Sequence, residues 1–121
     1  MKKLLNSFKY AFQGFSHATK TQLNFRVHLF ATAIALLLGW YLHLSANEWL
    51  WVILTITLVL AVELLNTAIE ILTDMVSPNW NEKAGHVKDV SAAAVTIAAF
   101  FAIVVGCIIF LPKIIVLLYA A

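Results

Sequence analysis

Residues 49–74, WLWVILTITLVLAVELLNTAIEILTD, decide the fold of this chain. The segment begins with a continuous apolar run, and Glu63, Asn66, Glu70 and Asp74 then interrupt a stretch that is otherwise apolar. An ionised carboxylate at the centre of a membrane helix costs about 2.5–3.5 kcal/mol on insertion scales. Acids in such a segment therefore indicate a functional site and not only a membrane anchor.

The composition agrees with a membrane location. The chain has 121 residues, of which 63% are hydrophobic and 12% charged, whereas soluble domains average about 45–50% apolar and about 25% charged residues. A soluble core of this size cannot hide so many apolar side chains, so we expect an integral membrane protein. The net charge of +2 does not suggest a nucleic-acid partner. Cys107 is the only cysteine, so no intrachain disulfide can form.

Three segments are apolar enough to cross about 30 Å of hydrocarbon, which takes roughly 20 helical residues. We expect these transmembrane helices at 25–44, 49–72 and 90–111, with Pro112 closing the last one. A polar loop at 74–89 joins the second and third spans.

The segment before the first span, residues 1–24, has a different pattern. Phe8, Phe12 and Phe15 recur at helical steps among lysines, which predicts an amphipathic helix. This helix lies in the membrane interface or packs on the bundle, and the two arrangements are compatible. We therefore predict a single all-α membrane domain over residues 1–121, with one surface helix and three transmembrane helices.

The basic residues predict the orientation. Five lie at or before the start of the first span and two lie in the 74–89 loop, whereas Lys113 alone falls on the other side. Cytoplasmic segments carry the excess of Lys and Arg. We therefore expect the N-terminus and the 74–89 loop in the cytoplasm and the C-terminus outside.

The four polar residues of the second span share one helix face. Their spacings of three, four and four residues match the helical repeat of about 3.6 residues per turn. They form a ladder from Asp74 at the cytoplasmic edge inward to Glu63. Three helices cannot shield such a face from lipid on all sides, so we expect a homo-oligomer with the ladder at a subunit interface.

The third span begins with Lys88 and Asp89 at the same membrane edge as Asp74, and His28, just inside the first span, is a further candidate. Carboxylates beside a lysine can bind a divalent cation and a polyphosphate, because Mg²⁺ takes one or two carboxylates together with phosphate oxygens. The chain has no G-x-x-x-x-G-K-[ST] loop, so any nucleotide site is not of the standard P-loop type.

Two motifs on these helices resemble a known signature. E-L-L-N-T-A-I-E-x-x-x-D at 63–74, followed by K-D-V-S-A-A-A-V at 88–95, is similar to the signature of small bacterial lipid kinases, the prokaryotic diacylglycerol kinases and their undecaprenol kinase relatives. Y-A-F-Q-G at 10–14 and N-F-R-V-H at 24–28 resemble further family segments, in the same order. The resemblance covers roughly residues 3–111 and implies a homotrimer in the bacterial inner membrane.

The resemblance also implies a reaction and residue roles. MgATP would phosphorylate the hydroxyl of a membrane lipid alcohol, either diacylglycerol or undecaprenol. Glu63 would be the general base and would bind the lipid together with Asn66, and Glu70 would hold Mg²⁺. The implied nucleotide-binding residues are Lys3, Tyr10, Asn79, Trp80, Asn81, Lys88 and Asp89.

Gln22 departs from the family pattern, which commonly has a second metal-binding glutamate four residues before the position of Arg26. A neutral amide offers Mg²⁺ an oxygen but no charge. If Gln22 is a metal ligand, then either metal binding is weaker or an acid such as Asp74 or Glu82 compensates.

A proton- or cation-coupled transporter is the alternative function, with Glu63 and Glu70 forming a relay. A relay needs polar groups that continue to the outer face, yet residues 50–62 offer only Thr55 and Thr57. A non-catalytic scaffold would not need the acids at all. A lipid kinase is the preferred interpretation, and the choice between the two lipid alcohols stays open, with N-F-R-V-H somewhat closer to the undecaprenol kinases.

Overall fold

The computed structural model describes all 121 residues and contains four α-helices. They are α1 (Lys2–Thr21), α2 (Leu23–Tyr41), α3 (Ala46–Val76) and α4 (Glu82–Ala120). α1 is amphipathic, and the other three are each long and apolar enough to cross a membrane. The predicted class, an all-α membrane protein with an N-terminal amphipathic helix and three transmembrane helices, is confirmed.

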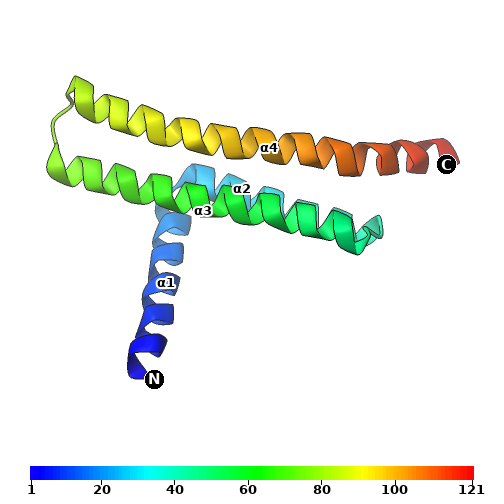
Figure 1. Ribbon diagram of the computed structural model, residues 1–121, viewed down its shortest axis with the longest axis horizontal. Helices are drawn as coiled ribbons and strands as arrows, with labels where there is room; N and C mark the ends of the chain where they lie inside the picture. Colours follow the sequence, from blue (N-terminus) through cyan, green and yellow to red (C-terminus); the bar gives the residue numbers. More distant parts are fainter.

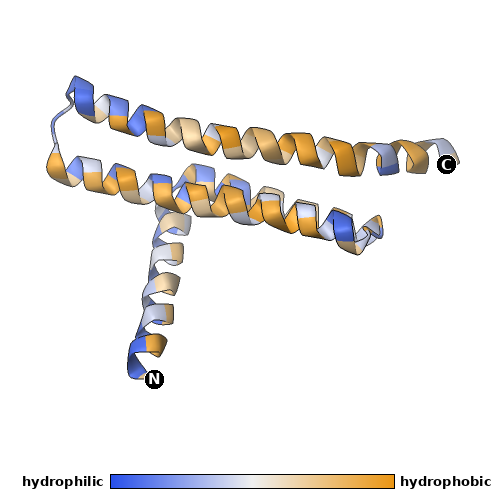
Figure 2. Ribbon diagram, viewed as in Figure 1, coloured by the Kyte–Doolittle hydropathy of each residue, from blue (hydrophilic) through white to orange (hydrophobic).

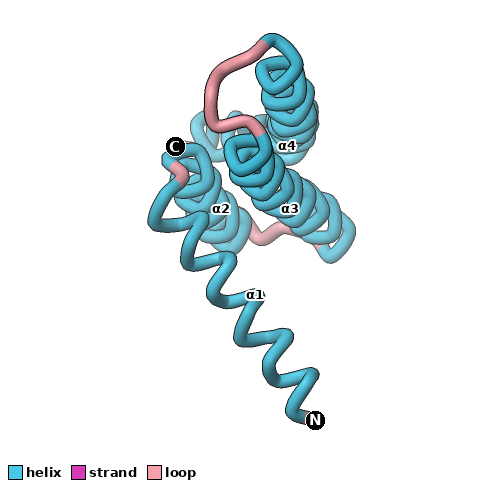
Figure 3. The backbone as a smooth tube through the Cα atoms, turned by 90° about the vertical axis from the view of Figure 1, so that its left-hand side faces the viewer, coloured by secondary structure: helices cyan, strands magenta, loops and turns pink.

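α3 is the middle helix of the bundle. α4 runs antiparallel along one side of α3, and α2 packs on another side (Figure 1). α1 leaves the start of α2 at a steep angle, so its N-terminal end points away from the other helices (Figures 1 and 3). Figure 2 shows apolar residues along α2, α3 and α4, with polar residues gathered where α4 begins. The three apolar helices therefore form one unit, and α1 projects from it.

The turn between α2 and α3 is fixed by local hydrogen bonds. His43 has a φ of 56°, and the Leu44 N–H donates to the Gly39 carbonyl at 3.2 Å, which is the pattern of a Schellman helix end. Ser45 then starts α3 with a capping box, because its hydroxyl accepts from the Glu48 N–H and the Glu48 carboxylate accepts from the Ser45 N–H. The turn therefore reverses the chain tightly.

Gly39 allows α2 and α3 to approach closely just before this turn. A Cβ at this position would lie 2.7 Å from the Trp49 ring, so a side chain there would clash with the indole. Trp49 uses the space to pack against the small apolar core made by Leu44, Val52, Val105 and Ile109.

The helix that carries the third predicted span does not end at Pro112, contrary to the expectation from the sequence, and the bounds of the span itself stay a prediction. Pro112 lies inside α4, which continues to Ala120. A proline removes one helical hydrogen bond, whereas ending the helix in an apolar segment would leave several backbone groups without partners. Next to the proline, Lys113 Nζ lies 3.3 Å from Glu48 Oε1 and holds α4 against the start of α3.

The three apolar helices differ in length. α2 has 19 residues, or about 28 Å at about 1.5 Å per residue, close to the hydrocarbon thickness of about 30 Å. α3 has 31 residues and is therefore twelve longer (31 − 19).

The last turns of α3 extend past the start of α2, together with the first turns of α4 (Figure 1). We call this part of the bundle the loop end. Only residues 77–81 are non-helical there, so most of the polar segment 74–89 is helical.

Candidate active site

The innermost polar residue of α3, Glu63, faces α2. Its side chain is 2% exposed, and Oε1 makes no hydrogen bond. His28 Nε2 on α2 lies 3.5 Å from this oxygen. Buried polar groups are nearly always hydrogen-bonded in native proteins, so this oxygen still lacks the donor that a buried carboxylate needs.

Asn66 connects α3 to α4 through a chain of hydrogen bonds. The Ser91 hydroxyl donates to Asn66 Oδ1 at 2.6 Å, and Asn66 Nδ2 donates to Glu70 Oε1 at 3.3 Å. An ionised carboxylate only accepts hydrogen bonds, so the amide must turn its NH₂ toward Glu70 and its oxygen toward Ser91. Ser91 and Asn66 are both buried. Ser91 thereby fixes the amide of Asn66 and, through it, one oxygen of Glu70.

Asp74 lies at the outer end of the ladder and pairs with Lys88 at the start of α4. The distance from Lys88 Nζ to Asp74 Oδ1 is 2.6 Å. Both side chains are substantially exposed, at 42% for Lys88 and 64% for Asp74. The polar face of α3 therefore passes from a buried carboxylate at Glu63 to a solvent-exposed ion pair at the loop end.

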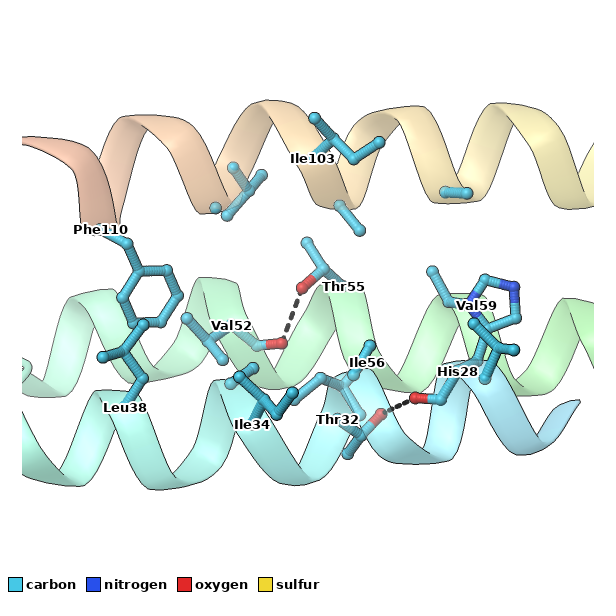
Figure 4. A pocket seen from close by; sticks show the side chains of 17 residues that line it. His28, Thr32, Ile34, Leu38, Val52, Thr55, Ile56, Val59, Ile103 and Phe110 are labelled. Carbon is cyan, nitrogen blue, oxygen red and sulfur yellow. Dashed lines mark hydrogen bonds between the residues drawn. The ribbon is translucent and has the colours of Figure 1, made fainter. Parts of the chain in front are cut away.

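An apolar groove of about 510 Å³ is lined by α2, α3 and α4, and its lining includes His28, which contacts Glu63. Figure 4 shows His28 and Val59 at one end of the groove and Leu38 and Phe110 at the other. Most of the lining side chains are hydrophobic. His28 belongs both to this groove and to the contact with Glu63, so the apolar groove leads to the buried carboxylate.

Two threonines of the groove use their hydroxyls within their own helices. The Thr32 hydroxyl donates to the His28 carbonyl at 2.7 Å, and the Thr55 hydroxyl donates to the Val52 carbonyl at 2.8 Å (Figure 4). Their donor protons are therefore already used. The groove consequently suits a hydrocarbon chain better than a polar solute.

Sequence comparisons identify the family to which these features belong. The family model described as "Prokaryotic diacylglycerol kinase" matches residues 9–110. The chain belongs to the prokaryotic diacylglycerol kinase family. Both motifs on α3 and α4 lie within the matched residues, so the residues described above belong to the part of the chain that carries the family relationship.

Some relatives of this chain are named diacylglycerol kinase, and another is named undecaprenol kinase. The chain is 41% identical over 116 residues to a diacylglycerol kinase of Synechocystis sp., a match that covers 95% of this chain and 66% of the relative. It is 34% identical over 113 residues to the undecaprenol kinase of Bacillus subtilis, covering 93% of this chain and 92% of the relative. It is 30% identical over 107 residues to the diacylglycerol kinase of Escherichia coli, covering 88% of each chain. The names of the relatives therefore refer to two different lipid alcohols.

The nucleotide-binding residues implied by the family resemblance fall into two groups in one chain. Two of them are exposed side chains on α1, which points away from the bundle (Figures 1 and 3). The other five lie at the loop end. The α1 group is Lys3 and Tyr10, and the loop-end group is Asn79, Trp80, Asn81, Lys88 and Asp89. A single chain does not bring the two groups together.

Some residues of the loop-end group already have structural partners. Asn81 caps α4, since its side-chain oxygen accepts from the Ala84 N–H at 2.9 Å, and its amide nitrogen also contacts the Ser77 hydroxyl. Lys88 is paired with Asp74. Trp80 is 83% exposed, so its indole is available to a ligand.

The metal ligands implied by the family resemblance are only partly positioned in one chain. Glu70 is half-buried and shares one oxygen with Asn66. Gln22 lies at the junction of α1 and α2, at the N-cap position of α2, but its side chain makes no cap hydrogen bond. No group of three acidic, histidine or cysteine side chains gathers in one chain. Because Mg²⁺ in phosphate-transferring sites takes one or two carboxylates plus phosphate oxygens and water, Glu70 fits such an ion.

Sequence reasoning assigned no role to Ser91. The residue stands in the motif K-D-V-S, but nothing in the sequence alone shows that its hydroxyl reaches Asn66, which is 25 residues earlier in the chain. One feature of the sequence could have pointed to Ser91. Its hydroxyl follows Lys88 and Asp89 by less than one helical turn, on a helix that must pack on the polar face of α3.

Proposed function

We propose that this family member is a lipid kinase that transfers the γ-phosphoryl group of MgATP to the hydroxyl of a membrane lipid alcohol. The observation that supports this reaction most directly is the buried Glu63 carboxylate, which contacts His28 at one end of an apolar groove. A lipid whose hydrocarbon occupies the groove presents its hydroxyl at that carboxylate. The nucleotide then approaches from the loop end.

In the proposed reaction Glu63 acts as the general base. The lipid hydroxyl gives its proton to the Glu63 carboxylate while its oxygen forms a bond to the γ-phosphorus. The bond from the γ-phosphorus to the bridging oxygen breaks, and its electron pair leaves on ADP. A positioned base contributes about 10²–10⁴-fold to such a step. Asn66, whose amide is held by Ser91, positions the reacting groups.

The charge of the phosphates must be neutralised at the loop end. A bound Mg²⁺ supplies that neutralisation, and Glu70 would hold it, with Gln22 as a second, uncharged ligand. Lys88 would exchange its Asp74 partner for phosphate oxygens, which an exposed pair permits at little cost. Asp89, together with Asn79, Trp80 and Asn81, would contact the nucleotide.

The assembly proposed for this reaction is a homotrimer in the bacterial inner membrane. α1 would lie on the cytoplasmic surface, with the loop end on the same side and the C-terminus outside. In one chain, α1, which carries Lys3 and Tyr10, projects away from the other helices (Figure 1). A neighbouring subunit that supplies α1 to the loop end would complete the nucleotide site.

The lipid alcohol is either diacylglycerol or undecaprenol, the two names carried by the relatives. Purified protein in lipid vesicles should phosphorylate at least one of them in the presence of ATP and Mg²⁺. The assay follows transfer of radiolabel from γ-labelled ATP to each lipid, with the Glu63→Gln variant as the control. Failure to label either alcohol would contradict the proposed function. A transporter is not favoured, because no polar path leads along the groove from Glu63.

A further inference from the structure

His28 carries the one basic group that lies within 4 Å of the Glu63 carboxylate. The Glu63 side chain is 2% exposed, and its Oε1 lies 3.5 Å from His28 Nε2. Figure 4 shows the imidazole at the end of the groove beside Val59 of α3. The Thr32 hydroxyl is bonded to the backbone carbonyl of His28, which leaves the imidazole itself free for Glu63.

The other charged groups near this part of the bundle have different partners. Arg26 Nη1 donates to the carbonyls of Thr19 and Lys20, both at 3.0 Å, and so holds α1 to α2. Lys88 on α4 is paired with Asp74. Glu70, the next acid on α3, accepts from Asn66. α3 itself contains no Lys, Arg or His. His28 is therefore the resident donor available to the Glu63 carboxylate.

We propose that His28 is a positioning residue for Glu63: its Nε2–H donates to Oε1 and leaves the second carboxylate oxygen for the lipid hydroxyl. This inference rests on the proposed function. The separation of 3.5 Å is somewhat longer than the usual range of about 2.7–3.2 Å. Such contacts are often long in unliganded active sites and shorten when substrate binds.

The two residues have different roles in the reaction. Glu63 takes the proton of the lipid hydroxyl, whereas His28 takes no proton and only fixes the plane of the carboxylate. Without that donor the carboxylate can rotate away from the hydroxyl. A misplacement of about 1 Å can cost as much as 10²-fold in rate, so loss of the donor should lower kcat and leave the KM for ATP unchanged.

A matched pair of variants tests this role. Glutamine can place its amide nitrogen near the position of Nε2, whereas asparagine can place it only near Nδ1, which is not the nitrogen facing Glu63. His28→Gln should therefore keep most of the wild-type kcat. His28→Asn should lower kcat by about 10- to 100-fold. Both variants are polar and uncharged, so a general effect of removing the histidine would be the same in both.

His43→Asn is the control, because this histidine lies in the distant turn between α2 and α3, and asparagine tolerates its positive φ of 56°. It should keep wild-type activity. All variants are compared at equal amounts of folded protein, measured by size-exclusion chromatography and thermal unfolding. Wild-type kcat in His28→Asn, equal losses in His28→Asn and His28→Gln, or a change confined to the KM for ATP would overturn the inference. A wild-type protein that labels no lipid would instead overturn the proposed function.

Discussion

Two charged contacts of α3 differ in their surroundings. The contact between His28 and Glu63 is almost closed to solvent on the Glu63 side, which is 2% exposed, whereas both partners of the Asp74–Lys88 pair are exposed by 42% or more. They lie eleven residues apart on one helix face (74 − 63). An exposed ion pair contributes about 0–1 kcal/mol to stability. A buried carboxylate has lost its hydration, so its stability depends on the partners that compensate for this loss.

In the proposed reaction, this difference lets one helix serve two reactants. The buried contact holds a carboxylate in one place, which suits a base that must meet a hydroxyl at a fixed distance. The exposed contact exchanges partners easily, which suits a lysine that must meet the phosphates of an arriving nucleotide. Changes near Glu63 should therefore affect kcat, and changes near Asp74 should affect nucleotide binding.

The largest effect is expected at the buried end. Glu63→Gln should lower kcat by about 10²–10⁴-fold, because a general base acts mainly in the transition state. The affinity for ATP, measured by equilibrium binding, should be retained. Glu48→Gln is the control, since this acid lies at the opposite end of α3 and pairs with Lys113, and it should stay active. A Glu63→Gln variant that keeps more than about a tenth of the wild-type kcat would exclude Glu63 as the base.

The second-largest effect is expected at Glu70, which lies between Glu63 and Asp74 on α3. Glu70→Gln should raise the Mg²⁺ concentration for half-maximal activity by at least about tenfold, because the site loses its main anionic ligand. Gln22→Glu should lower that concentration and should partly rescue Glu70→Gln. Such non-additivity is expected for residues that share a ligand. Mg²⁺ titrations of the wild type, both single variants and the double variant test this coupling. Strictly additive effects would show that Gln22 does not bind the metal.

A smaller effect is expected on stability at Ser91. Ser91→Ala removes the donor to Asn66 Oδ1 in a buried environment and should cost about 1–3 kcal/mol, because the amide oxygen is left without a partner. Unfolding in detergent measures the loss. Thr96→Ala on the same helix is the matched control, since Thr96 is exposed and bonds only to the Ala92 carbonyl. Equal losses in the two variants would show that Ser91 does not hold Asn66.

The smallest effect is expected at the exposed pair. Asp74→Asn should change the free energy of unfolding by less than about 1 kcal/mol. It should lower the KM for ATP, because Lys88 no longer needs to leave a carboxylate to reach phosphate. The change in KM should shrink at high ionic strength, since salt screens exposed charges. A loss of stability as large as that of Ser91→Ala would show that the pair is structural.

Much of this architecture could be predicted from the sequence. The length and apolar character of three segments predict membrane-spanning helices, and the spacing of Glu63, Asn66, Glu70 and Asp74 places them on one face. These predictions succeed because they depend on helical periodicity and on the cost of burying polar groups, which are local properties of the chain. Pro112 does not end the helix, because the apolar surroundings favour continuation of the helix over a broken end.

The partners of the polar residues could not be predicted in the same way. That His28 meets Glu63, and that Ser91 meets Asn66, depends on how α2 and α4 are rotated about their axes against α3. Apolar helices with hydrophobic residues on every side give little information about that rotation. The separation of Lys3 and Tyr10 from the loop end likewise depends on the angle of α1, and the predicted homotrimer stays a prediction.

The short length of α2 has a consequence for the membrane around the protein. α2 has 19 residues, and α1 turns away where α2 begins, so we expect this helix to set the depth of Glu63 relative to the lipid headgroups. A bilayer thicker than α2 must thin around the protein, or it must cover the opening of the groove with acyl chains. In the proposed reaction ATP arrives from water and the alcohol arrives from lipid, so the two would meet at that depth. In the proposed reaction, turnover should therefore depend on the thickness of the host bilayer.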